Sequence, residues 1–180
     1  MTERADDGRP DEQDDALPDD LVLPDDLVIP DDLAGLLDGS AETPSIALVV
    51  TQVALPSALA AACALAQVDV DVVPSSIGAI AVMRDPATIA DGAAAISKLL
   101  RQLPVVVLER REGEISANRW VAGAHDDELP PGLVLADAPA LLEDLLLGST
   151  AAADHPDVVT SVGLSRWKAM RMLANSRKGR

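Results

Sequence analysis

Four short apolar runs, all between residues 45 and 108, limit most strongly the folds that this chain can adopt. Each run is only four or five residues long and most are rich in Val and Ile, so we expect four β-strands rather than helices. In the second run Asp69 and Asp71 alternate with valines, which predicts a strand with one exposed face. The runs are residues 46–50, 68–72, 79–83 and 105–108.

Two helical segments separate these strands. Pro56 begins an Ala-rich stretch that extends to about Gln67, with apolar residues at helical spacing. Asp85 and Pro86 are typical of the N-cap and first residue of a helix, which we expect to continue to about Leu103. Beyond the fourth strand, the pair Glu112-Gly113 predicts a hairpin turn into a fifth strand over residues 115–122.

The order of these elements predicts an α/β (α+β) fold with a ferredoxin-like βαββαβ core over residues 45–123. In that arrangement the first and third strands are central and the second is an edge. The fifth strand would then be an added edge strand beside the fourth. Because this fold hosts many unrelated functions, it does not identify an activity.

Three of the strands are apolar on both alternations, although helices cover only one face of a ferredoxin-like sheet. The second face therefore needs a cover. We expect residues 124–150 to provide it, as a loop and a covering helix from Ala138 to Leu147 that Gly148 ends. The alternative cover is a second subunit, which would make the protein a homodimer.

Cysteine and aromatic residues are scarce. The single cysteine, Cys63, excludes an internal disulfide, and its Ala-rich surroundings indicate a buried residue. Abundant Ala, Asp, Arg and Pro indicate a high-GC bacterium as the source. The acidic beginning of the chain lacks the pattern of a secretory signal, and no apolar run is long enough for a transmembrane segment, so a cytoplasmic location is expected.

Charge divides the chain into three parts. Residues 1–44 have a net charge of −13, residues 45–163 of −9, and residues 164–180 of +6. We expect the first part to be a disordered acidic arm. The acidic body argues against broad nucleic-acid binding, which leaves only the basic tail for that role.

The arm contains three hexapeptide repeats over residues 17–34, each built around Pro-Asp-Asp-Leu. A proline every six residues prevents a continuous helix, and the alternation of acidic and apolar residues is typical of linear interaction motifs. The pattern Leu-Pro-x-x-Leu-Val-Leu recurs at residues 129–135, so we hypothesise that the arm imitates that segment; a chance match is the alternative. The candidate partner-binding residues of the arm are Leu21, Val22, Leu23, Leu27, Val28 and Ile29.

Residues 151–180 are predicted to be a linker and a basic amphipathic C-terminal helix. The run Gly163-Leu164-Ser165-Arg166 and the downstream Arg171 and Leu173 resemble the turn of lac-repressor-type helix-turn-helix domains, over residues 156–173. This resemblance implies that Ser165, Arg166, Lys168 and Arg171 face DNA. Alternatively, the segment is one helix whose apolar face holds Leu164, Trp167, Met170 and Leu173, and which binds the acidic body, an acidic partner or an anionic membrane.

No combination of residues predicts catalysis, a cofactor or a metal site. His125 and the acidic residues after it lack ligand spacing and are interpreted as a solvated loop. The expected function is therefore that of a non-enzymatic interaction or adaptor protein, which engages a protein partner through the arm, the tail and the aromatic residues Trp120 and Trp167. The alternatives are a DNA-binding regulator that uses the tail and a small-molecule-sensing regulatory domain.

Overall fold

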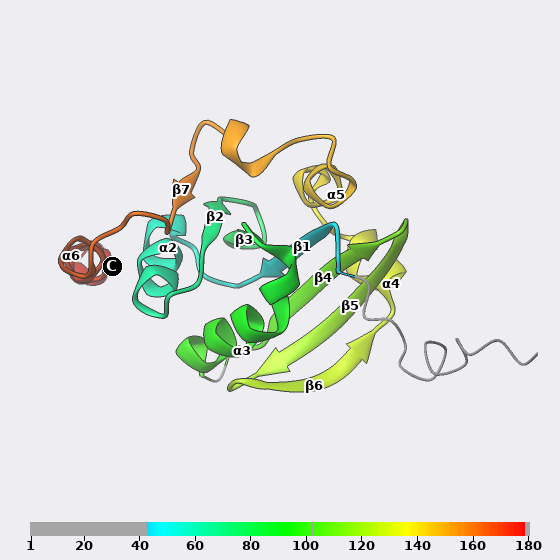
Figure 1. Ribbon diagram of the computed structural model, residues 1–180, viewed down its shortest axis with the longest axis horizontal. Coiled ribbons are helices and arrows are strands. Elements are labelled where there is room, and N and C mark those ends of the chain that lie inside the picture. Colours follow the sequence, from blue (N-terminus) through cyan, green and yellow to red (C-terminus); the bar gives the residue numbers. More distant parts are fainter. Residues whose placement is uncertain (1–42, 102, 179–180) are drawn as a thin grey trace, which may run out of the picture. The chain divides into compact units, whose positions relative to one another are not determined.

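The computed structural model describes residues 43–101 and 103–178 (Figure 1). These residues form a mixed α+β structure with one seven-stranded antiparallel sheet, in the order β6-β5-β4-β1-β3-β2-β7. The strands are β1 (Ile46–Val50), β2 (Val70–Val73), β3 (Ile80–Met83), β4 (Val105–Arg111), β5 (Glu114–Val121), β6 (Ala124–Leu129) and β7 (Val159–Thr160). The helices are α2 (Pro56–Leu65), α3 (Ile89–Leu100), α4 (Pro131–Ala136), α5 (Ala140–Leu147) and α6 (Arg166–Lys178), with 3₁₀ turns η1 (Pro86–Thr88) and η2 (Ala152–Asp154).

The centre of the sheet agrees with the sequence prediction. Strand β1 pairs with β3 on one side and with β4 on the other, and β5 lies beside β4. The turn between β4 and β5 has positive φ at Glu112 (44°) and Gly113 (93°), which is the geometry of a two-residue hairpin turn. Asp85 does cap a helical turn, because its side chain accepts a hydrogen bond from the Ala87 N–H at 3.0 Å. That turn is η1, however, and α3 begins only at Ile89.

Strand β2 is not an edge, and the prediction of a half-exposed strand is wrong. All four of its residues are buried, and β7 pairs with its outer side. Ser161 secures this pairing: its hydroxyl accepts from the Val70 N–H and lies 2.8 Å from the Val68 carbonyl oxygen. The Asp71 carboxylate is tolerated there because Arg84 binds both of its oxygens, at 2.8 and 2.9 Å.

Residues 124–129 form a strand, although the sequence predicted a loop. Residues 124–128 are all exposed, so no apolar alternation marks them as a strand. Strand β6 is held instead by backbone pairing with β5 and by Arg119, which reaches Asp126 at 2.6 Å and Asp127 at 3.5 Å.

Two apolar clusters lie on opposite faces of the sheet. Helices α2 and α3 cover the first, where Leu59 and Ile96 meet valines such as Val49 and Val107. Helix α5 covers the second through Leu142, Leu145 and Leu146, and α4 packs beside it. Residues between 131 and 147 therefore do cover the second face, although as two helices rather than one. Gly148 ends α5 in the left-handed conformation, as expected.

The C-terminal segment does not have helix-turn-helix geometry. Residues 159–160, which the resemblance places in a first helix, form β7, and a turn leads from there into α6. The β-branched run at Val158-Val159-Thr160 and the preceding Pro156 favour an extended strand over a helix. Helix α6 packs against α2. None of the helices in the described part of the chain is long and apolar enough to cross a bilayer.

The arm, with its six candidate residues Leu21, Val22, Leu23, Leu27, Val28 and Ile29, lies outside the described residues. The segment that it was hypothesised to imitate is described. Leu129 ends β6 and Pro131 begins α4, a helix without a buried residue in which Leu133 is 73% exposed. Imitation of this segment by the arm stays a hypothesis.

Candidate functional site

Helix α6 presents a surface that combines exposed apolar and cationic side chains. Trp167 is 66% exposed and Met170 is 53% exposed, and Val162, just before the helix, is exposed as well. Arg166, Lys168 and Arg171 are exposed on the same helix. We call Trp167, Met170, Arg166, Lys168 and Arg171 the outward face of α6.

The orientation of α6 follows from one small residue. Ala169 is fully buried, and Met172 and Leu173 on the same side of the helix are partly buried. The Ala-rich helix α2 lets the backbone of α6 approach closely at this point, where a larger side chain would separate the two helices. Of the predicted apolar face, Trp167 and Met170 stay exposed and do not pack on the body of the protein, whereas Leu164 and Leu173 are partly buried.

The first turn of α6 is fixed by Ser165. Its hydroxyl accepts a hydrogen bond from the Lys168 N–H at 3.3 Å, which is the role of an N-cap. The Arg171 guanidinium lies 4.1 Å from the centre of the Trp167 ring, in a cation–π contact that holds both side chains on the outward face. Of the tail residues predicted to face DNA, Ser165 thus has a structural role, whereas Arg166, Lys168 and Arg171 are exposed.

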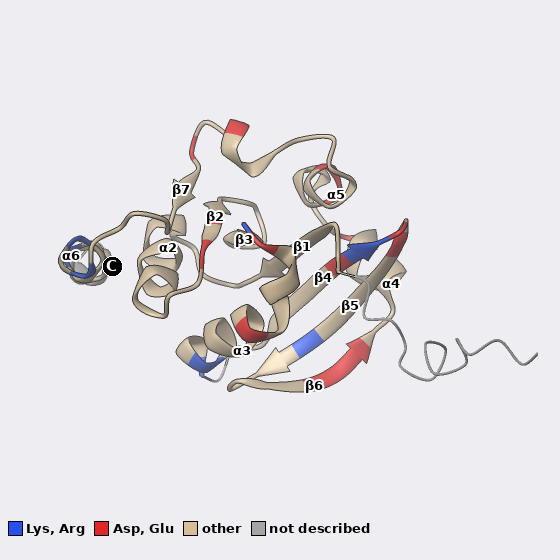
Figure 2. Cartoon of the chain, in the orientation of Figure 1, with Lys and Arg blue, Asp and Glu red and all other residues tan. Residues whose placement is uncertain are grey.

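Helix α2, against which α6 packs, does not compensate the positive charge of α6. Figure 2 shows basic residues on α6 and no acidic residue on α6 or on α2. Helix α2 and strand β7 contain no charged residue at all. Tryptophan and arginine are enriched among the residues that contribute most to protein–protein binding.

Trp120, the other aromatic candidate, is part of the structure rather than of a free surface. It is partly buried against the first apolar cluster. Its ring also meets the His125 ring edge-on, with the centres 5.8 Å apart. His125 in turn bonds the Asn118 side chain at 3.1 Å. These contacts assign Trp120 to the packing of β5 and β6.

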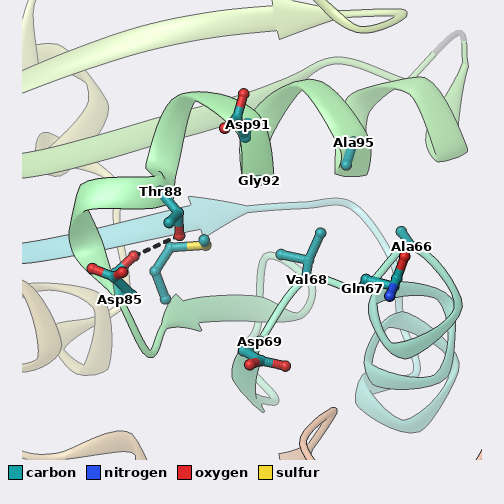
Figure 3. Close-up of a pocket in the computed structure, with 10 residues that line it drawn as sticks. Ala66, Gln67, Val68, Asp69, Asp85, Thr88, Asp91, Gly92 and Ala95 are labelled. Carbon is teal, nitrogen blue, oxygen red and sulfur yellow. Dashed lines mark hydrogen bonds between the residues drawn. The ribbon is translucent and has the colours of Figure 1, made fainter.

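A cleft of about 510 Å³ opens where α3 faces the turn between α2 and β2 (Figure 3). Val68 lies at its centre, and Asp69, Asp85 and Asp91 are among the residues that line it. Its size is within the range of small-molecule sites. The sequence did not reveal this cleft, because its residues are far apart in the chain. They are Ala66, Gln67, Val68, Asp69, Met83, Asp85, Thr88, Asp91, Gly92 and Ala95.

The carboxylates of the cleft already have structural roles. Asp85 caps η1, and Asp91 lies in the first turn of α3, where a negative charge is favourable. The charge of Asp69 also acts on Arg84, whose pKa is raised first by the hydrogen bond that Arg84 donates to Asp71 and only to a small extent by Asp69. Among the described residues no group of three or more His, Cys, Asp or Glu side chains is placed to hold a metal ion.

Cys63 is not a nucleophile in this structure. Its side chain is fully buried in the first cluster, and burial raises its pKa to about 12. At neutral pH it is therefore the unreactive thiol. The sequence prediction of a buried cysteine is confirmed.

Comparison of this chain with protein-family models, with curated proteins and with solved structures gave no match.

Proposed function

We propose that this is a non-enzymatic interaction protein and that the outward face of α6 binds an acidic, leucine-bearing segment of a protein. The observation that carries this proposal is the exposure of Trp167 and Met170 between cationic side chains. Both side chains are on a helix that is already formed, so binding orders little additional backbone. A large apolar side chain in this position is suited to anchor a partner.

Complementary charge selects the partner. Arg166, Lys168 and Arg171 attract an acidic segment as it approaches, and they pair with its carboxylates in the complex. A nucleic acid or an anionic membrane would also meet this face, but the whole chain has a net charge of −16 and repels such large anionic surfaces. A short acidic peptide approaches α6 alone and avoids most of that repulsion.

We also infer that residues from β1 to β4 have the ferredoxin-like topology. The order of elements, β-α-β-β-α-β, and the strand order β4-β1-β3-β2 support this assignment. Strands β5, β6 and β7 are then additions on the two sides of that unit. This topology serves as a scaffold for α6 and does not itself indicate a reaction.

The test uses a fluorescein-labelled synthetic peptide with the sequence of residues 17–34 and a chain in which the six aspartates of the repeats are neutral. We call this chain the repeat-neutral variant, because its own arm no longer competes by charge. Its substitutions are Asp19→Asn, Asp20→Asn, Asp25→Asn, Asp26→Asn, Asp31→Asn and Asp32→Asn. Fluorescence anisotropy should show saturable binding that weakens as salt rises.

Trp167→Ala and Arg171→Ala in the repeat-neutral variant should each weaken peptide binding, the former at least tenfold because it removes the anchor. Lys98→Ala, an equal change of charge on α3, is the control and should leave binding unchanged. The proposal is wrong if no peptide binds, or if a DNA duplex or vesicles with anionic lipid bind through Trp167 and the peptide does not.

A second function is favoured by the cleft at α3, which matches the alternative of a small-molecule-sensing domain. Its carboxylate rim and the apolar Val68 and Met83 suit a small organic cation. A thermal-shift screen of amines against the intact chain tests this. A ligand that raises the melting temperature of the intact chain but not that of Asp69→Asn supports it, and a flat screen contradicts it.

A further inference from the structure

We infer that residues 17–34 of the arm bind the outward face of α6 in the same chain, so that the protein covers its own docking surface until a partner displaces the arm. This inference rests on the proposed function of that face. It adds the identity of the first occupant and a form of self-regulation.

The charges of the two segments are opposite and concentrated. Residues 17–34 contain six aspartates and no basic residue, whereas residues 164–180 contain six basic residues and no acidic one. Helix α2, against which α6 packs, carries no charged residue and so does not neutralise the cations of α6. Opposite charges at this density attract most strongly at low ionic strength.

The apolar residues of the two segments also correspond. In the repeats, triplets such as Leu21-Val22-Leu23 lie between pairs of aspartates. On α6, too, apolar side chains are flanked by charged ones: Trp167 and Met170 are exposed among Arg166, Lys168 and Arg171. One triplet can thus cover the apolar side chains while the flanking aspartates meet the cations, which a purely acidic segment cannot do.

The length of the arm allows this contact. An extended chain covers about 3.3–3.6 Å per residue, so the nine residue steps from Ala34 to Thr43 cover roughly 30 Å, and each earlier repeat adds about 20 Å. A folded domain of this size has a radius of gyration of roughly 14 Å. A tether of this kind gives an effective concentration in the millimolar range, which favours the same chain over a second copy.

Two tryptophans in the whole chain make the inference directly measurable. The indole N–H groups give two signals in a ¹H–¹⁵N spectrum of the full chain, and a Trp120→Phe chain identifies that of Trp167. In the repeat-neutral variant the Trp167 signal should shift, and acrylamide should quench Trp167 at least twice as efficiently as in the intact chain. Raising the salt concentration should move the intact chain toward the same state.

A second variant controls for the loss of charge, because it removes six acidic groups from the arm outside the repeats. Its substitutions are Asp6→Asn, Asp7→Asn, Asp11→Asn, Glu12→Gln, Asp14→Asn and Asp15→Asn. In this variant Trp167 should remain as protected as in the intact chain.

Equal quenching of Trp167 in the intact chain and the repeat-neutral variant would overturn the inference. If the free peptide still binds the variant at Trp167, the proposed function stands and only self-occupancy fails; if it does not bind, both fail. Protection that depends on protein concentration, with a doubled mass in light scattering, would make a second copy the occupant. Loss of hydrogen-exchange protection in α4 instead of α6 would overturn the inference and place the arm at residues 129–135, the segment that it was hypothesised to imitate.

Discussion

Several buried polar residues in this protein are hydrogen-bonded locally or are kept neutral. The buried Asp71 pairs with the exposed Arg84, and Ser161 satisfies the backbone of β2. Cys63 is the neutral case: its thiol lies among the side chains of α2 and the sheet, and burial raises its pKa from 9.0 to about 12. Its ionisation is therefore linked to unfolding.

The pH dependence of stability follows from this linkage. In the unfolded chain the thiol ionises above pH 9, whereas in the folded protein it stays protonated until about pH 12. Its contribution is fully present below pH 9 and is lost as the pH rises toward 12. By pH 11 the loss amounts to about 2–3 kcal/mol from this group alone.

Urea unfolding of the intact chain and of Cys63→Ala, at pH 8, 9, 10 and 11, measures this effect. The stability of the intact chain should fall more steeply than that of the variant. The chain has no tyrosine, so lysines and the N-terminus account for most of the remaining titration and are common to both proteins. Parallel curves would show that Cys63 ionises freely in the folded state.

At the scale of the element, α6 is held by its fit to α2. Ala169 is buried against the Ala-rich helix, so Ala169→Leu should force the helices apart. We expect a loss of about 1–3 kcal/mol, as for other overpacked sites. Ala174→Leu adds the same volume to an exposed position of α6 and should be nearly neutral. Urea unfolding measures both, and equal losses would contradict the docking of α6 through Ala169.

The helices and strands that could be predicted from the sequence are those that bury an apolar face. Strands β1 and β3 to β5 have such a face, and so do α2, α3 and α5. Strands β6 and β7 and helix α4 lack a regular apolar pattern in the sequence. The two strands are held by backbone pairing with β5 and β2, and α4 is held by its position beside larger elements. Pairing by β7 also explains why β2 was mistaken for an edge: the partner strand of β2 lies far along the chain, with Val72 opposite Val159 and Asp71 opposite Thr160.

The same reasoning applies to the candidate site. Arg166, Trp167, Lys168 and Arg171 were predicted to contact a partner, and the structure leaves all four exposed. The sequence did not show which side of α6 faces outward, because a helix with both Ala169 and Trp167 has two possible apolar faces. The packing surface of α2, which accepts only a small residue, decides between them.

At the scale of the whole molecule, the ends of the sheet decide whether copies of the chain associate. On one side the sheet ends at β7, which is only two residues long and is a poor template for another strand. On the other side it ends at β6, six residues long. Here Asp126, Asp127 and Glu128 place three carboxylates on the edge, and a second copy of β6 would bring three more beside them.

We therefore predict that these charges keep the sheet from pairing with a second copy. A chain with Asp126→Thr, Asp127→Val and Glu128→Thr keeps the backbone donors and acceptors of β6 but loses the repulsion. It also loses the ion pairs of Asp126 and Asp127 with Arg119, and the new residues, which favour strands, offset that loss. Light scattering after size-exclusion chromatography should show a monomer for the intact chain and self-association for the variant. Asp6→Asn, Asp7→Asn and Asp11→Asn in one chain remove as much charge outside the sheet and should leave a monomer. Association of both variants would show that net charge, rather than the edge of β6, keeps the copies apart.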